Sequence, residues 1–230
     1  LRFSQAKAQI EDLDLVLFTH LHIDHVASLP ALMKAGYFSD RSKDLKILGP
    51  AGNDYFPGLD EYLRLQFSDK GAYRYMSDIL SKQSDSFSLI PYEVGAGKSF
   101  EFNTFRVMAV PVHHGIVSAL AYRVEIDNRV SVFSGDTTAQ DKALERIAMG
   151  ADILIAHHAI PQEAPCAAKR LHMTPQRIAE VASAAKPKIL LLSHRMKRTY
   201  GHEEQSEQII NNLYKGKIIW AEDLMKLTLP

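Results

Sequence analysis

Residues 19–25, THLHIDH, place three histidines and one aspartate within seven positions, directly after an apolar run. Imidazole nitrogens and carboxylate oxygens are ligands for divalent metal ions. At this density they can bring several neutral donors and one anion to a single point. A solvated loop that happens to be rich in histidine is the alternative. We interpret the segment as a metal-binding motif.

Further polar clusters follow apolar stretches later in the chain, in VPVHHG, VFSGDT, LIAHHA and LLSH. Nine of the ten histidines lie in these clusters, in the first motif and in LHMT. Loops at the carboxyl ends of strands converge on a site in layered α/β folds. Histidines scattered through core and surface would not collect in this way, so the pattern predicts one functional site.

Apolar periodicity predicts strands that alternate with helices. Residues 13–18 are the strand before the first motif, a helix over 26–35 ends at Gly36, and LKILGP is the next strand. A mixed helical segment covers residues 54–80. Strands dominate 86–134, with a tight turn at Asp127-Asn128. Helices over 140–149, 175–185 and 203–214 then alternate with strands over 152–156, 188–193 and 217–220, which indicates the α/β class.

Length and composition restrict the classes of protein. The 230 residues, 46% of them hydrophobic, suffice for one large domain or two fused halves. The 27 basic and 27 acidic residues give no global field that favours nucleic acid. A lone Cys166 excludes an internal disulfide and argues against a cysteine-based zinc site. No run approaches the ~18 apolar residues of a membrane span.

The chain opens at Leu1 without methionine and enters a strand almost at once. We therefore expect that N-terminal strands of the domain precede this residue. A signal peptide cannot be judged from this start, so the sequence leaves the compartment open.

The ordered set of HxHxDH, a histidine before glycine, SGDT and a late strand ending in SH resembles the metallo-β-lactamase superfamily of binuclear metal hydrolases. The resemblance covers residues 13–220 and is greatest with the ribonuclease Z, aryl-phosphodiesterase and arylsulfatase-like branch. It implies a four-layer αββα sandwich of two mostly antiparallel or mixed sheets flanked by helices. Residues 1–230 would be one domain, with a substrate-shaping helical insert at 51–85, whose aromatic residues either wall a pocket or form helical core.

The resemblance also implies a site with two divalent ions. The implied ligands are His20, His22 and His114 for one ion, Asp24, His25 and His194 for the other, and Asp136 for both. His113 and His114 alternate across their strand, and His114 is chosen because it directly precedes the glycine of the family motif. Zinc is favoured, and manganese or iron suits the same ligands. A hydroxide bridging the two ions would be the nucleophile, and Asp24 would orient it.

His172, in LHMTPQ, is the candidate proton donor to the leaving group. It resembles a histidine that contacts the scissile phosphate in the ribonuclease Z branch, and an ordinary histidine before the helix cap Thr174 is the alternative. That branch carries His-Glu-Ala-Thr where this chain has His157-His158-Ala159-Ile160, so the orienting glutamate is replaced. His157, His158 and Arg195 are candidate substrate-binding residues. The alternatives are that the two histidines form a hydrogen-bonded pair at the end of their strand and that Arg195 is a solvated surface charge.

The resemblance and the composition together predict a metal-dependent hydrolase that favours phosphodiesters. Only GIVSALAYRVEIDNRVSVFSG separates His114 from Asp136, which leaves no room for the tRNA-gripping arm of short ribonuclease Z proteins. We favour a small anionic ester over RNA as substrate, keep RNA as an alternative, expect no membrane association, and allow for a homodimer. Aryl sulfates or carboxylic esters and lactones are alternatives on the same metals. A non-catalytic metal module is disfavoured, because structural zinc sites usually close with four ligands.

Overall fold

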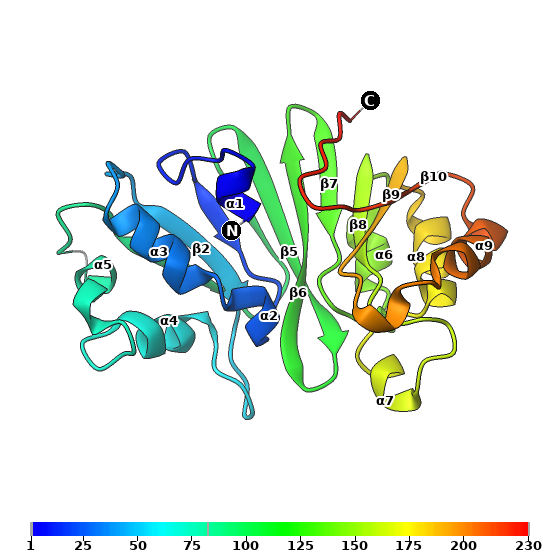
Figure 1. Ribbon diagram of the computed structural model, residues 1–230, viewed down its shortest axis with the longest axis horizontal. Coiled ribbons are helices and arrows are strands. Elements are labelled where there is room, and N and C mark those ends of the chain that lie inside the picture. Colours follow the sequence, from blue (N-terminus) through cyan, green and yellow to red (C-terminus); the bar gives the residue numbers. More distant parts are fainter. Residues whose placement is uncertain (1, 82, 230) are drawn as a thin grey trace. The chain divides into compact units, whose positions relative to one another are not determined.

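The computed structural model describes residues 2–81 and 83–229. It divides into two compact units, residues 1–95 and 96–230, each built around one sheet (Figure 1). The N-terminal unit carries the THLHIDH motif, and the C-terminal unit carries every later cluster.

The sheet of the N-terminal unit has the order β1-β2-β3, and its strands are β1 (Leu15–Leu17), β2 (Leu45–Pro50) and β3 (Leu89–Val94). Both strand pairs are parallel. Our expectation of mostly antiparallel or mixed sheets does not describe this sheet. Parallel neighbours need a crossover rather than a hairpin, and helices supply it at both steps. These are α2 (Ile23–Val26) and α3 (Leu29–Tyr37), then α4 (Leu59–Phe67), η1 (Arg74–Met76) and α5 (Asp78–Ser81). A short α1 (Arg2–Gln5) precedes β1.

Gly36 does not end a helix, contrary to our expectation, because α3 continues through it to Tyr37. A Cβ at this position would lie 3.2 Å from the Phe87 ring and 3.3 Å from Ile10. The glycine therefore serves close packing. In a sequence, a glycine can mark either the end of a helix or a place where two elements pack closely, and the residue type alone does not distinguish the two.

Apolar residues of α3, α4 and the three strands form the core of this unit. In α4, the residues at positions 59, 63 and 67 recur every fourth position and are fully buried, as one face of an amphipathic helix should be. Of the aromatic residues in the predicted insert, Phe67 belongs to this core, whereas Tyr55 and Tyr75 are exposed. The substrate-shaping role of residues 51–85 stays a prediction.

The sheet of the C-terminal unit has seven strands in the order β10-β9-β8-β7-β6-β5-β4. The strands are β4 (Lys98–Glu101), β5 (Phe105–His114), β6 (Val117–Ile126), β7 (Arg129–Phe133), β8 (Ile153–His157), β9 (Ile189–Ser193) and β10 (Lys217–Trp220). Pairs from β4 to β7 are antiparallel and pairs from β7 to β10 are parallel, so this sheet is mixed. Asp127 (φ 49°) and Asn128 (φ 61°) make the predicted tight turn between β6 and β7.

Helices α6 (Ala143–Ala148), α8 (Pro175–Ala185) and α9 (Glu203–Leu213) contribute buried residues to the core of this unit. Figure 1 shows α8 and α9 side by side. The predicted bounds of α8 are confirmed, because Thr174 caps it by accepting the Arg177 N–H at 3.3 Å and Pro175 begins it. Shorter segments are α7 (Cys166–Lys169) and η2 (Lys197–Thr199).

Strand directions place the chemistry-bearing residues of this unit at one edge of its sheet. Strand β5 is antiparallel to β6, which is antiparallel to β7, so β5 runs in the same direction as β7, β8 and β9. Their carboxyl ends therefore meet at one edge. His114 ends β5, His157 ends β8, and Asp136 and His194 follow β7 and β9.

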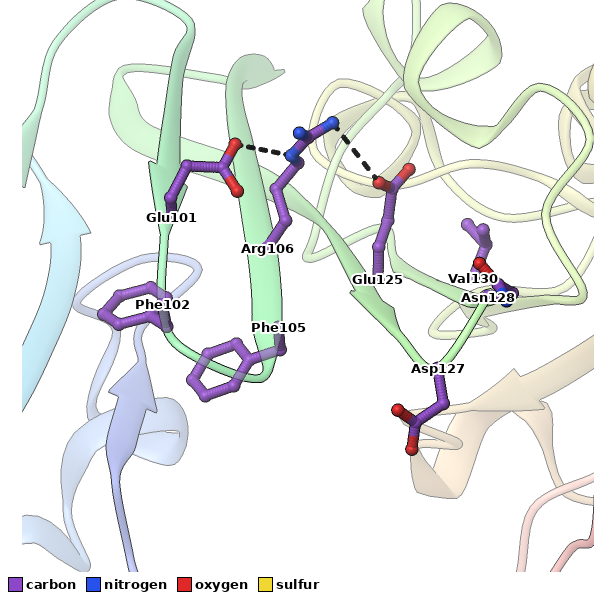
Figure 2. Close-up of a pocket in the computed structure, with 8 residues that line it drawn as sticks. All are labelled: Glu101, Phe102, Phe105, Arg106, Glu125, Asp127, Asn128 and Val130. Carbon is purple, nitrogen blue, oxygen red and sulfur yellow. Dashed lines mark hydrogen bonds and ion pairs between the residues drawn. The ribbon is translucent and has the colours of Figure 1, made fainter.

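The opposite edge holds a pocket in which Phe102 stacks on Phe105, with ring centroids 4.6 Å apart (Figure 2). Arg106 lies between Glu101 at 2.5 Å and Glu125 at 3.8 Å. The predicted site residues are absent from its lining. Throughout residues 2–81 and 83–229, the helices are too short or too polar to cross a membrane.

Candidate metal centre

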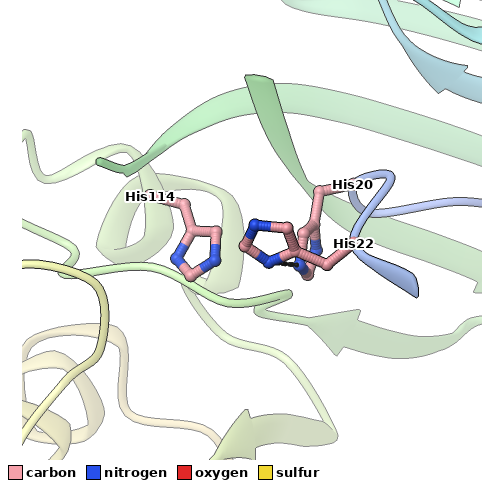
Figure 3. Close-up of side chains that lie close together, drawn as sticks. All are labelled: His20, His22 and His114. Carbon is pink, nitrogen blue, oxygen red and sulfur yellow. Dashed lines mark hydrogen bonds between the residues drawn. The ribbon is translucent and has the colours of Figure 1, made fainter. Parts of the chain in front are cut away.

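The first motif, residues 19–25, follows β1 and continues into α2. Figure 3 shows its His20 and His22 side chains. His20 is fully buried, and its Nε2 lies 3.1 Å from His22 Nδ1. The short helix α2 turns back so that the rings of His20 and His25 are 4.0 Å apart, centroid to centroid. Asp24 Oδ2 lies 3.6 Å from His25 Nε2 and is the more exposed of the two side chains. The N-terminal unit therefore gathers the four predicted ligands of this motif.

His114 is buried at the end of β5, and its Nδ1 lies 2.8 Å from the carbonyl oxygen of Leu171. A carbonyl can only accept, so Nδ1 carries the proton and the lone pair resides on Nε2. This is the form in which histidine binds a metal, with its second nitrogen held by a backbone oxygen. The adjacent His113 is directed to Thr138 instead, with Nδ1 3.1 Å from Oγ1.

Asp136 is a buried carboxylate with two imidazoles beside it. Its Oδ2 lies 3.6 Å from His172 Nδ1 and 3.5 Å from His194 Nε2. These distances are long for hydrogen bonds. They are close to the roughly 3.4 Å that separates two ligands of a tetrahedral ion with bonds of about 2.1 Å. Ligand atoms of His114, Asp136 and His172 all lie within 4.8 Å of one another. The predicted ligands His114 and Asp136 therefore fit a divalent metal, and the predicted proton donor His172 lies beside them.

His194 follows β9 with a φ of 53°, in the left-handed region of the backbone. This conformation turns the chain sharply at the strand end. It also places the imidazole beside Asp136 rather than in line with the strand. Non-glycine residues adopt it uncommonly, because the Cβ crowds the following carbonyl.

His157 is fully engaged by hydrogen bonds within the C-terminal unit. Its Nε2 accepts the Met173 N–H at 3.1 Å, and its Nδ1 lies 3.4 Å from Ser134 Oγ. Burial lowers the pKa of His157 well below its usual value, and the nearby imidazoles, with His172 first, lower it further. The ring is therefore neutral. It lies beside the predicted proton donor, with centroids of His157 and His172 5.4 Å apart.

His158 and Arg195, the other candidate substrate-binding residues, lie around Trp220 at the end of β10. His158 Nε2 is 3.0 Å from Ser206 Oγ, and its ring meets the Trp220 ring edge-on at 5.0 Å. Arg195 is 3.3 Å from Glu203, and its guanidinium lies over the Trp220 ring at 5.8 Å. Arg195 also lines a pocket with His194, whereas the lining residues of that pocket do not include His158.

Several groups at this edge could not have been found from sequence. The Leu171 carbonyl fixes His114, and the Met173 amide binds His157, but a backbone group has no residue identity to read. Ser134 is the exception, because its place in SGDT, two residues before Asp136, was visible. Its hydroxyl, which donates to the Gly135 carbonyl at 2.6 Å, gives no further sequence signal.

Comparison with known proteins decides the family. A family model described as "Beta-lactamase superfamily domain" matches residues 1–195. The chain belongs to this family. Its fold is the metallo-β-lactamase fold, α/β with sheets flanked by helices, as predicted.

Individual matches agree with this assignment. A protein named ribonuclease Z from Mycobacterium bovis is 26% identical over 234 residues, which cover 94% of this chain and 79% of the relative. Two solved structures share the fold. The metallo-β-lactamase fold protein YhfI from Bacillus subtilis has a TM-score of 0.72 at 19% identity and covers 93% of this chain and 77% of its own. Human tRNase Z, short form, has a TM-score of 0.71 at 22% identity, with 99% and 83% covered.

Proposed function

We propose that this chain is a metal-dependent phosphodiesterase that binds two divalent ions, zinc being favoured, and hydrolyses a small phosphodiester. The observation that carries the proposal is the buried group of His114, Asp136 and His172, in which a backbone carbonyl holds His114 in its metal-binding tautomer. Membership of a hydrolase superfamily and relatives named ribonuclease Z support the phosphodiester as the bond that is cleaved.

In the proposal, the ligands are His20, His22, Asp24 and His25 of the first motif together with His114, Asp136 and His194 of the C-terminal unit. Each of these is an imidazole or a carboxylate, the donor types that suit zinc, manganese and iron. When bound, the two ions would supply Lewis acidity toward the phosphoryl oxygens and lower the pKa of a water.

The residues of the chain do the remaining chemistry. Asp24 is exposed enough to reach solvent and would orient the attacking water through its carboxylate. His172 would hold a proton at an imidazole nitrogen and deliver it to the departing oxygen. Its buried position beside Asp136 excludes most competing water from that proton. The Leu171 carbonyl fixes the His114 imidazole before substrate arrives.

A small diester is favoured over tRNA for two reasons. Between His114 and Asp136 the chain forms only β6, β7 and the short turns that precede, join and follow them. The formal net charge is zero, and tight RNA binding depends strongly on phosphate contacts made by basic residues. RNA of the tRNA-precursor type is therefore a comparison substrate in the test.

The test is hydrolysis of bis(4-nitrophenyl) phosphate by protein loaded with zinc or manganese, with metal content recorded. We expect turnover that falls at least about 100-fold in Asp24→Ala. The matched control is Asp12→Ala, an exposed aspartate ahead of β1, which should behave as the parent. 4-Nitrophenyl sulfate, a lactone and a tRNA precursor are assayed in parallel. Faster turnover of any of these would replace the proposed substrate class, and no turnover with two metals bound would refute an enzymatic role.

A further inference from the structure

We propose that His157 is a positioning residue, which fixes the segment carrying His172 relative to the segment carrying Asp136. This inference rests on the proposed function for its catalytic meaning. The contacts that support it lie entirely within the C-terminal unit and do not depend on a bound metal.

The direction of each hydrogen bond around His157 follows from its partners. Nε2 faces the Met173 N–H at 3.1 Å, and because a backbone amide can only donate, Nε2 must carry the lone pair. In the neutral ring the proton is then on Nδ1, which faces Ser134 Oγ at 3.4 Å. The Ser134 hydroxyl has one proton, and it points to the Gly135 carbonyl at 2.6 Å. Its lone pairs are left for His157, whose backbone N–H also donates to them at 3.1 Å.

These bonds form a one-way chain between two loops. It runs from the Met173 amide through the imidazole of His157 and the hydroxyl of Ser134 to the carbonyl of Gly135. Met173 directly follows His172, and Gly135 directly precedes Asp136. The imidazole therefore spans the gap between the backbone of the predicted proton donor and the backbone of the predicted bridging carboxylate.

A second histidine holds the other side of His172. The Leu171 carbonyl accepts from His114 Nδ1 at 2.8 Å, so the backbone on both sides of His172 is bonded to an imidazole. Beyond Met173 the chain enters α8 through the Thr174 cap. The His172 side chain thus extends from a backbone that is fixed at consecutive points. The His172–Asp136 separation of 3.6 Å is set by these contacts rather than by a direct hydrogen bond.

Two substitutions of His157 separate its hydrogen bond to the Met173 amide from its hydrogen bond to the Ser134 hydroxyl. The side-chain amide of His157→Gln reaches the position of Nε2 and can still accept from the Met173 N–H. The shorter amide of His157→Asn reaches only the position of Nδ1, so it can keep Ser134 but leaves the Met173 amide without its acceptor. The two variants are matched in polarity, and Ser134→Ala breaks the chain at its other end.

The first readout is hydrogen exchange of the Met173 amide, which needs no turnover. We expect exchange to accelerate at least about tenfold in His157→Asn and to stay near the parent rate in His157→Gln. The Ile178 amide, which donates to the Thr174 carbonyl at 2.9 Å in α8, is the internal control. A general loss of stability would accelerate both amides, whereas loss of the contact accelerates only Met173. Unchanged Met173 exchange in His157→Asn would overturn the inference.

The second readout is the dependence of kcat on the leaving group. Nitrophenolate departs without a proton, whereas phenolate benefits from one, so a misplaced His172 should slow diphenyl phosphate more than bis(4-nitrophenyl) phosphate. The ratio to compare is kcat for bis(4-nitrophenyl) phosphate divided by kcat for diphenyl phosphate. We expect this ratio to rise at least about tenfold in His157→Asn and Ser134→Ala and to stay near the parent value in His157→Gln. Equal slowing of both substrates would refute positioning. If the parent hydrolyses neither diester, the proposed function fails, and the Met173 exchange still decides whether His157 holds this segment.

Discussion

His158 should make the protein sensitive to acid in a way that can be calculated. Its ring is buried at the end of β8 between Ser206 and Trp220, and burial lowers the pKa of His158 to about 4. In the unfolded chain a histidine has a pKa near 6.5, so the unfolded state binds the proton more readily over this range. A pKa difference of this size corresponds to about 3 kcal/mol of unfolding free energy.

The sign follows from the lowered pKa in the folded state. The contribution is fully present above pH 6.5, where both states are neutral, and is lost as the pH falls from about 6.5 to about 4. Urea unfolding of the metal-free protein at a series of pH values measures it. Between pH 7 and pH 4 the parent should lose about 3 kcal/mol more than His158→Gln, whose side chain does not titrate.

Burying glutamine in place of histidine lowers the unfolding free energy by the same amount at every pH, so it does not change how the unfolding free energy varies with pH. His202→Gln is the matched control, because His202 is exposed at the start of α9 and solvent surrounds it in both states. That variant should follow the parent. If the parent and His158→Gln give parallel curves of unfolding free energy against pH, the argument from burial is wrong.

Further predictions concern the candidate centre and the elements that hold it. Asp136→Asn should reduce bound metal, measured by elemental analysis after dialysis, because an amide is a weaker ligand than a carboxylate; unchanged content would remove Asp136 from the ligand set. His172→Asn should retain the metal yet slow hydrolysis about 100-fold or more, and metal loss instead would make His172 a ligand. Thr174→Ala should lower the unfolding free energy by about 1 kcal/mol, as the N-cap of α8 is lost. Asn128→Val should cost about 1–2 kcal/mol in the same measurement, while Asn128→Gly should cost little, because only glycine accepts a positive φ freely.

Sequence reasoning succeeded where side-chain type and spacing determine the structure. The apolar run before Asp136 and the glycine-free turn at Asp127-Asn128 located β7 and its hairpin. Thr174 and Pro175 located the start of α8 at Pro175, since a cap and an N1 proline act locally.

It was less accurate where backbone conformation overrode the pattern. A helix was expected over 140–149, but α6 spans Ala143–Ala148. Ala139 and Lys142 adopt φ values of 54° and 57°, which helix periodicity does not anticipate because neither is glycine. The roles at the centre were hidden for a related reason. His157 and His158 are identical neighbours in the sequence, yet one binds a backbone amide beside His172 and the other binds Ser206.

At His194 the backbone conformation favours one residue type and the proposed chemistry requires another, because the residue is left-handed and its imidazole is a proposed metal ligand. Histidine in this conformation costs about 1 kcal/mol, a cost that glycine avoids for lack of a Cβ and that asparagine reduces through local hydrogen bonds of its short side chain. A library of position-194 variants selected only for heat resistance should therefore drift toward asparagine or glycine. The same library selected for turnover should retain the imidazole. The fold carries at this strand end a residue that its own stability does not favour.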